Sequence, residues 1–356
     1  MFLDDLGITD DWTLENQPQE RANLQLAMYA THLATGSTIL CRTVKASTIR
    51  AYLATVAKFL GRFRAIDPRF VTSGDKKLAP AISMVIAEQE RWETVPNRRE
   101  PFTLELQATL AAFEDIADNP CGLHAAMSNW TMCNLYAGCR GIEWAQTNCT
   151  HRHLSTYHSN RFGNAYAFTL EDVQLFTSSS QPVPVAAALA DPITVAKIKL
   201  RFEEQKNGDN GEWKLFTRNP THPHLCFVAN FMQILRRHRT LTKSDPKLPL
   251  SVYRAPDGSP NHITTADVER VLRRAASICY GLDPVKNRTQ LALWSSHSLR
   301  VGACTTLYSK GFSEMEIKYL LRWKSNAFMT YLRNLAVTSR RHNIAMNETS
   351  EIPNFV

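Results

Sequence analysis

The sequence predicts a mainly α protein with a small antiparallel β-sheet (α+β), divided into a helical N-terminal domain and a larger second domain. Three observations lead to this prediction. Apolar residues recur at helical spacing over much of the chain, residues 193–218 alternate as strands do, and ETVPNRREPF (residues 93–102) combines proline and charge without periodicity. At 356 residues, the chain is long enough for two domains. We therefore expect domains over 1–93 and 103–341, with a linker over 94–102 and a tail over 342–356.

The first domain is predicted to contain three helices. NLQLAMYATHLATG has an apolar face and ends at Gly36, and KASTIRAYLATVAKFLGRF has another that ends near Gly61. A third helix is expected over roughly Ala79 to Trp92. Together they predict a small helical bundle.

The second domain is predicted to begin with a helix after Thr103, a suitable N-cap residue. ITVAKIKLRFEEQKNGDNGEWKLFTR predicts a β-hairpin, because its turn KNGDNGE holds the Asn and Gly residues that adopt positive φ. Two stretches near 178–192 and 240–260 are rich in Pro, Ser or Asp and are expected to be loop-like insertions. Near the end, Gly311 closes one helix, and Ser313 with Glu316 forms a capping box for the next.

The most informative segment is SSHSLRVGACTTLYSKGFSEMEIKYLLRWKSNAFMTYLRN, residues 295–334. His297 and Arg300 are three residues apart, so on a helix they share one face and point at one ligand. Phosphate suits them, because arginine binds its oxygens bidentately and histidine moves a proton near neutral pH. Trp323 and Tyr331 follow on short predicted helices, and a tyrosine brought to the same place is a nucleophile.

This segment resembles the C-terminal signature of the tyrosine recombinases, in which H-x-x-R is followed by a His or Trp and then a Tyr. The phrase RWKSNAFMTY is most similar to recombinases of Crypton and DIRS mobile elements. The family's first arginine has a counterpart in MCNLYAGCRGIEWAQ, where Gly138 precedes Arg140 and Glu143 follows. Its hairpin lysine corresponds to Lys206, although other lysines lie in or beside the same hairpin: Lys197, Lys199 and Lys214.

The resemblance implies a site-specific DNA recombinase or integrase. Arg140 and Arg300 would hold the phosphate, and His297 would assist proton removal from Tyr331 or hydrogen-bond the phosphate. Lys206 would protonate the leaving 5′ oxygen. Trp323 would donate a hydrogen bond to a phosphate oxygen and support the tyrosine helix. Tyr331 would form a covalent 3′-phosphotyrosine.

The resemblance also implies which partners the chain has. It predicts a homo-tetramer on paired sites in double-stranded DNA, with no cofactor, metal or small-molecule substrate. The wording of STIRAYLATVAKF is similar to the family's SAM-like core-binding domain, which clasps DNA. Two alternatives stay open: a type IB topoisomerase, and a domesticated DNA-binding protein without catalysis.

Composition agrees with a nucleic-acid partner. The net charge is +8, and residues 1–96 hold 11 of the 41 basic and 11 of the 33 acidic residues, so the excess lies in the second domain. The opening MFLDDLGITDDW is acidic and lacks the apolar run of a secretory signal, and no apolar stretch has membrane-spanning length. We therefore expect an intracellular protein, nuclear if its source is eukaryotic.

The eight cysteines show no C-x-x-C pair. One group has the residue types of a zinc site: Cys133, Cys139, Cys149, His151 and His153. Because Cys133 and Cys139 lie on the helix and turn that present Arg140, we expect reduced, partly buried thiols instead of a metal site.

Overall fold

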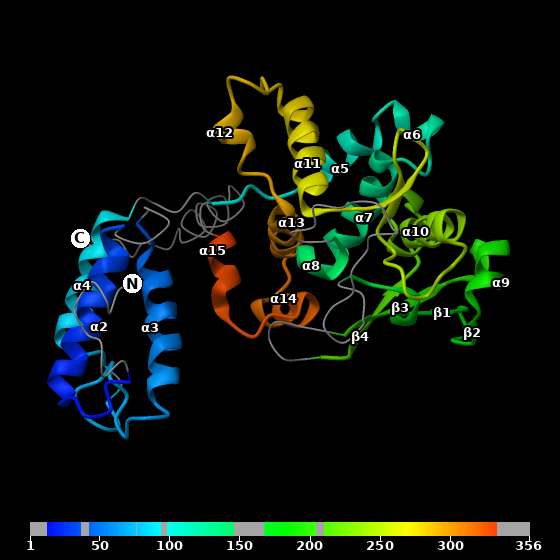
Figure 1. Ribbon diagram of the computed structural model, residues 1–356. Helices are drawn as coiled ribbons and strands as arrows, with labels where there is room; N and C mark the ends of the chain where they lie inside the picture. The colour runs from blue at the N-terminus through cyan, green and yellow to red at the C-terminus, as the bar shows by residue number, and fades with distance from the viewer. Residues whose placement is uncertain are drawn as a thin grey trace, which may run out of the picture. The chain divides into compact units, whose positions relative to one another are not determined.

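The computed structural model describes residues 13–36, 43–75, 77–93, 98–145, 167–203 and 210–332. The chain divides into two compact units, Met1–Asn97 and Arg98–Val356 (Figure 1). Each unit buries its own apolar side chains. The fold class is the predicted one, mainly α with a small antiparallel sheet.

The described part of the first unit contains α2 (Gln19–Ala34), α3 (Ala46–Leu60) and α4 (Pro80–Trp92). All three pack against one another, as Figure 1 shows. Their core includes Ile49 and Ile82, both fully buried. The three predicted helices are therefore present, and each apolar face points into a shared core.

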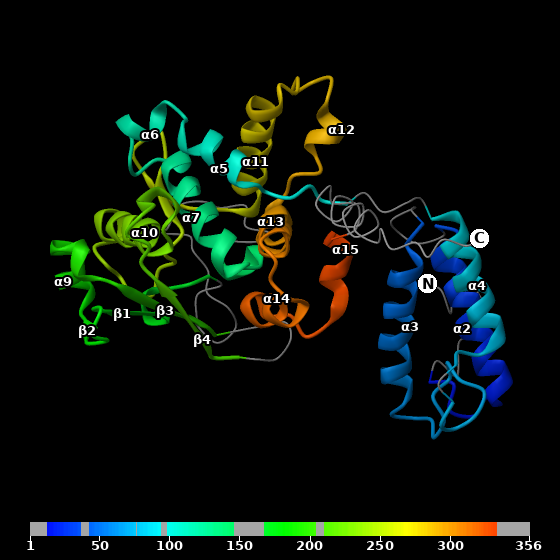
Figure 2. The ribbon, with the colours of Figure 1, turned by 180° about the vertical axis from the view of Figure 1, so that it is seen from behind.

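The second unit carries the remaining helices and strands (Figure 2). Its described α-helices are α5 (Leu104–Ala111), α6 (Asp115–Asp118), α7 (Leu123–Ala137), α8 (Gly141–Trp144), α9 (Val185–Ala190), α10 (Phe227–Thr242), α11 (Thr265–Tyr280), α12 (Arg288–Leu291), α13 (Ser296–Ser309), α14 (Glu314–Leu321) and α15 (Met329–Leu332). Its described 3-10 helices are η2 (Leu170–Asp172), η3 (Pro192–Thr194), η4 (Pro223–Leu225) and η5 (Asn326–Phe328).

The larger sheet is antiparallel, with strand order β2-β1-β3-β4. Its strands are β1 (Val173–Phe176), β2 (Pro182–Val183), β3 (Lys197–Phe202) and β4 (Glu212–Thr217). Along β3, alternate residues Ile198, Leu200 and Phe202 are buried, so one face of the sheet joins the core. The pairing of β3 with β4 forms the predicted hairpin, and β5 (Val252–Arg254) with β6 (Pro260–His262) forms a second one.

Helix α7 lies at the centre of this unit, packed against α5, α10 and α13. Most of its residues are buried, including Trp130, which stacks on Trp144 of α8. A central helix of this kind holds its C-terminal turn firmly, and Arg140 follows that turn directly.

The region near 178–192 is more ordered than a loop-like insertion. It contains β2, which pairs with β1, and α9. The run VAAALA explains α9, because alanine and leucine are strong helix formers. Among the described residues, no helix combines the length and apolar character needed to cross a bilayer.

Candidate functional site

Arg140 is presented by a sharp turn at the end of α7. Gly138 adopts the left-handed conformation (φ 55°), and a Cβ there would lie 2.7 Å from Cδ2 of Leu321, so both the backbone and the packing favour glycine. Arg140 is then the N-cap of α8. Its backbone N–H donates to Glu143 Oε2 (2.8 Å), and its Nη1 donates to Glu143 Oε1 (3.0 Å). The motif G-x-R-x-x-E therefore forms one compact turn that fixes Arg140.

His297 and Arg300 lie in the first two turns of α13. The backbone N–H of Ser295 donates to Ser298 Oγ (3.0 Å), which caps the start of the helix. The backbone N–H of Phe102 donates to the Ser298 carbonyl oxygen (2.9 Å), so the segment that enters the unit also lies against α13. These contacts set the position from which both side chains project.

Arg300 is buried, at 5% exposure, and two backbone carbonyls hold it. Its Nη1 donates to the Gly138 oxygen (2.9 Å), and its Nη2 donates to the Leu321 oxygen (3.3 Å). Burial and the nearby charge of Arg140 lower the pKa of Arg300 to about 10, with Arg322 acting in the same direction. Arg300 therefore stays protonated at neutral pH, in a cluster of positive charge.

Tyr331 meets His297 although 34 residues separate them. His297 Nε2 and Tyr331 Oη form a 2.6 Å hydrogen bond, and the two rings pack edge to face with centroids 5.4 Å apart. Burial lowers the pKa of His297, helped by the charges of Arg300 and Arg99. Burial raises the pKa of Tyr331; Arg300 opposes that rise and Cys304 adds to it. At neutral pH the pair is thus an un-ionised tyrosine beside an uncharged imidazole that can accept its proton.

Trp323 lies between the arginine and the tyrosine. Its ring is 4.8 Å from the Arg300 guanidinium carbon and 5.7 Å, centroid to centroid, from the Tyr331 ring. A cation over an indole face is favourable, so the ring orders both neighbours. The structure therefore brings His297, Arg300, Trp323 and Tyr331 together. Arg140 lies close enough for its charge to lower the pKa of Arg300.

Lys206 lies outside the described residues, between β3 and β4. The other lysines of this hairpin have partners of their own. Lys197 Nζ donates to Ser180 Oγ (2.7 Å), and Lys199 lies over the Phe176 ring. Lys214 pairs with Glu212 (2.7 Å) and donates to the backbone oxygen of Tyr319 (3.1 Å), which brings it to α14.

Of the predicted thiol and imidazole cluster, Cys133 and Cys139 are buried, whereas Cys149, His151 and His153 lie outside the described residues. Burial raises the pKa of Cys139 to about 12 and that of Cys133 well above its ordinary value. Within the described ranges, no group of three or more His, Cys, Asp or Glu side chains could hold a metal ion.

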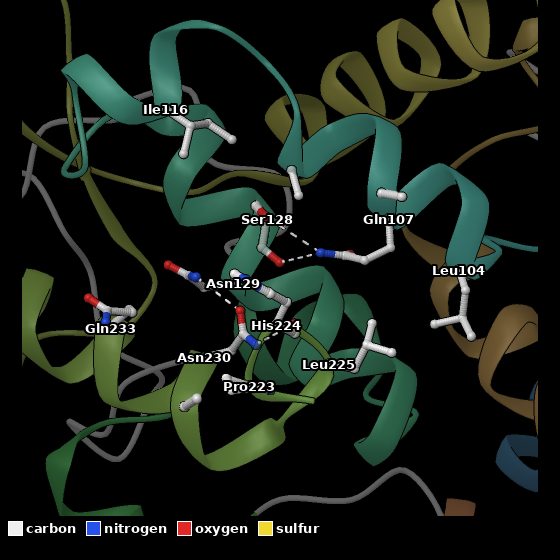
Figure 3. A pocket seen from close by; sticks show the side chains of 13 residues that line it. Leu104, Gln107, Ile116, Ser128, Asn129, Pro223, His224, Leu225, Asn230 and Gln233 are labelled. Carbon is white, nitrogen blue, oxygen red and sulfur yellow. Dashed lines mark hydrogen bonds between the residues drawn. The ribbon is translucent and has the colours of Figure 1, made fainter. Parts of the chain in front are cut away.

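A separate pocket of about 460 Å³ lies between α5, α7, η4 and α10 (Figure 3). Leu104, Ile116 and Leu225 line it together with amides, and Gln107 donates to the Ser128 oxygen at its wall (3.0 Å). No Asp, Glu, Lys or Arg side chain lines this pocket, and none of the predicted site residues does. It is therefore distinct from the arginine and tyrosine cluster.

Arg322 is a neighbour of the site that the motif did not select. It pairs with Glu143 and is 5% exposed. One sequence signal marks its position: Arg322 directly follows the last apolar residue of α14, where glycine or asparagine usually ends a helix. In the structure, Arg322 adopts the left-handed conformation that those residues favour.

Comparison with known proteins gives structural matches alone. No family model matches the chain, and no curated protein matches it. The Tn1549 transposon integrase in complex with transposon right end DNA has 11% identity and a TM-score of 0.48, covering 91% of this chain and 84% of that one. The XerH site-specific recombinase bound to palindromic difH has 13% identity and a TM-score of 0.45 (95% and 73%). The XerA recombinase has 13% identity and a TM-score of 0.39 (95% and 88%).

These three matched proteins are an integrase and two recombinases. Because the identities are 10–13% and the TM-scores are below 0.5, the function of this chain has to be argued from its own residues.

Proposed function

We propose that this protein is a site-specific DNA recombinase that cuts and rejoins strands through Tyr331. The observation that carries the proposal is the 2.6 Å hydrogen bond from Tyr331 Oη to His297 Nε2, formed beside the buried Arg300. This contact supports the roles proposed here: Tyr331 as the nucleophile, His297 as its base and Arg300 as the cation that binds the phosphate.

The proposed reaction begins with attack of Tyr331 Oη on the phosphorus of a DNA phosphodiester. The new O–P bond forms as the bond to the 5′ oxygen breaks, and His297 Nε2 takes the tyrosine proton. Lys206 supplies a proton to the departing 5′ oxygen, a general-acid contribution of about 10²–10⁴-fold. Arg140 and Arg300 stabilise the negative charge that grows on the non-bridging oxygens.

The reverse reaction completes strand exchange. A 5′ hydroxyl gives its proton to the neutral Lys206 amine and attacks the phosphotyrosine. The bond to Tyr331 Oη breaks, and His297 returns its proton to the tyrosine. The covalent link conserves the energy of the phosphodiester, so the exchange needs no nucleotide cofactor. Double-stranded DNA and a homo-tetramer on paired sites are part of this proposal.

Attack within one subunit follows from the same contact. Because Tyr331 bonds to His297 of its own chain, each tyrosine would attack the phosphate held by its own arginines. Mixing Tyr331→Phe with Arg300→Ala subunits should then restore no cleavage, and restored cleavage would indicate attack between subunits.

The direct test uses a pool of nicked DNA duplexes of random sequence. After cleavage near a nick, the short end with the 5′ hydroxyl diffuses away, so the reverse reaction cannot occur and the adduct accumulates. Wild-type protein should form a denaturant-resistant protein–DNA adduct, and Tyr331→Phe should form none while binding DNA normally. Tyr319→Phe is the matched control, since Tyr319 is on the preceding helix and is 71% exposed. An unchanged adduct with Tyr331→Phe would exclude this nucleophile.

A plasmid-relaxation assay, run beside the adduct assay, separates the two alternatives. Relaxation of supercoiled plasmids with little site preference would indicate a type IB topoisomerase. DNA binding with the usual salt dependence, and no adduct on any substrate, would indicate a protein that keeps the fold without the chemistry.

A further inference from the structure

We propose that Arg322 is a positioning residue that holds Glu143 and thereby sets the place of Arg140; this inference rests on the proposed function. Arg322 Nη2 lies 3.1 Å from Glu143 Oε2, and its Nη1 lies 3.3 Å from Glu143 Oε1. Paired bonds of this kind fix both the distance and the plane of a carboxylate. The same two oxygens bind the backbone N–H and Nη1 of Arg140.

Glu143 is therefore shared between two arginines. Its side chain is 5% exposed, and that of Arg322 is 1% exposed, so neither is held in place by water. The Arg140 side chain is 24% exposed, so it is the more accessible of the two arginines. Without Arg322, Glu143 would have Arg140 as its remaining ionic partner and would draw that guanidinium inward, away from an incoming phosphate.

The surroundings of Arg322 indicate a rigid support. Its guanidinium carbon lies 3.4 Å from the centre of the Phe202 ring, at the end of β3. Its Nη2 also donates to the Ala137 oxygen at the end of α7 (3.4 Å). Arg322 thus joins three segments that lead to site residues: the turn before Arg140, the strand before Lys206 and the helix end before Trp323.

The backbone of Arg322 supports a specific role for this side chain. Its φ is 59° and its ψ is 51°, a left-handed conformation that costs energy for a long side chain such as arginine and little for glycine. Glycine would fit here without that cost, so the contacts of the guanidinium offset the strain. Arg322 also adds positive charge, since it lowers the pKa of the neighbouring Arg300.

Two different substitutions of Arg322 test the role, so that the test does not depend on the folding of a single variant. Arg322→Gly removes the guanidinium and relieves the left-handed backbone, while Arg322→Gln keeps a long side chain. We expect both variants to fold and to bind nicked duplex DNA within a few-fold of wild type. Single-turnover formation of the Tyr331 adduct at saturating DNA should fall by about 10²-fold, as expected for an arginine displaced by about 1 Å.

Arg237→Gln is the matched control. Arg237 is equally buried, at 4% exposure, but its partners are the Pro120 oxygen and Asn129 Oδ1, and neither Pro120 nor Asn129 belongs to the proposed site. Folded Arg237→Gln protein should react at the wild-type rate. An equal loss in this control, or wild-type rates in both Arg322 variants, would overturn the proposal.

A double variant tests whether Arg322 acts through Glu143. In a Glu143→Gln background, the further change Arg322→Gly should lower the rate by less than about 3-fold, because coupled residues are not additive. A full 10²-fold loss in that background would refute the route through Glu143.

A crystal structure of Arg322→Gly separates this inference from the proposed function. We expect the Arg140 guanidinium to shift toward Glu143, and an unmoved Arg140 would overturn the inference even if cleavage is seen. Conversely, Arg140 could shift in the Arg322→Gly structure while the wild-type protein forms no adduct. That result would support the positioning role of Arg322 and reject the recombinase function.

Discussion

Replacing Gly302 by alanine tests a close approach between helix α13 and the Phe102 backbone. Gly302 is on α13, and a Cβ built there would lie 2.0 Å from the Phe102 carbonyl oxygen and 2.9 Å from its carbonyl carbon. Carbon and oxygen normally stay about 3.3 Å apart, so the backbone segment or the helix has to move by about 1.3 Å. Phe102 is fully buried and cannot yield easily.

The expected cost follows from this overlap. Overpacking of a well-packed core costs about 1–3 kcal/mol, and we expect the upper part of that range because the clash is with backbone, not with a flexible side chain. The hydrogen bond from the Phe102 N–H to the Ser298 oxygen (2.9 Å) also joins the Phe102 backbone to α13, so it should weaken when the two segments move apart. Because α13 carries His297 and Arg300, adduct formation should fall too, by about 10²-fold for a shift near 1 Å.

Urea unfolding followed by tryptophan fluorescence measures the first effect. The control is Gly61→Ala, since Gly61 has φ −62° and its Cβ would lie 3.3 Å from the Ala57 oxygen. That variant should change the free energy of unfolding by less than about 1 kcal/mol. If Gly302→Ala unfolds within about 0.5 kcal/mol of wild type, the close packing of α13 against Phe102 is refuted.

Three further outcomes follow from the structure. Because the pKa of His297 is lowered from 6.5 and the uncharged ring is the base, the second-order rate of adduct formation should be flat above pH 6.5 and fall below it; a midpoint above 6.5 in a pH–rate profile would contradict this. Lys206→Ala should lose cleavage and regain it on a 5′-bridging phosphorothiolate, whose sulfur leaves without a proton, whereas Lys214→Ala should show no such rescue; rescue of Lys214→Ala instead would make Lys214 the acid. His238 is fully buried, and its pKa is lowered to about 4 by burial, so the unfolded state alone takes the proton between pH 6.5 and 4. Stability should be complete above pH 6.5 and fall by about 3 kcal/mol by pH 4, and His238→Gln should lack that loss in urea titrations at pH 7, 5 and 4.

Local features of the structure were predictable because neighbouring residues decide them. Thr103 caps α5 by accepting from the Leu106 N–H, and Ser313 with Glu316 caps α14, both as expected. The β3 and β4 hairpin follows from alternation and turn residues within one short stretch.

Periodicity was less informative about packing at single positions. Leu320 follows Ile317 on α14 and is equally apolar, yet it is 37% exposed while Ile317 is fully buried. A helical pattern predicts which side of a helix faces the core, but the neighbouring elements decide how far around the helix the core extends. The order within residues 178–192 has the same origin, since β2 exists through its pairing with β1.

The sequence by itself determined the chemistry available to this protein: an H-x-x-R pair, a following Trp and Tyr, and an arginine after a glycine turn. Tertiary structure alone decided which of these groups meet. The bond from His297 to Tyr331 spans 34 positions, and the pair of Glu143 with Arg322 spans 179. Contacts at such separations depend on how whole helices pack around α7, and no local spacing encodes that packing. The end of an apolar run marks the position of Arg322 in the sequence, but the fold alone places its buried charge against Glu143.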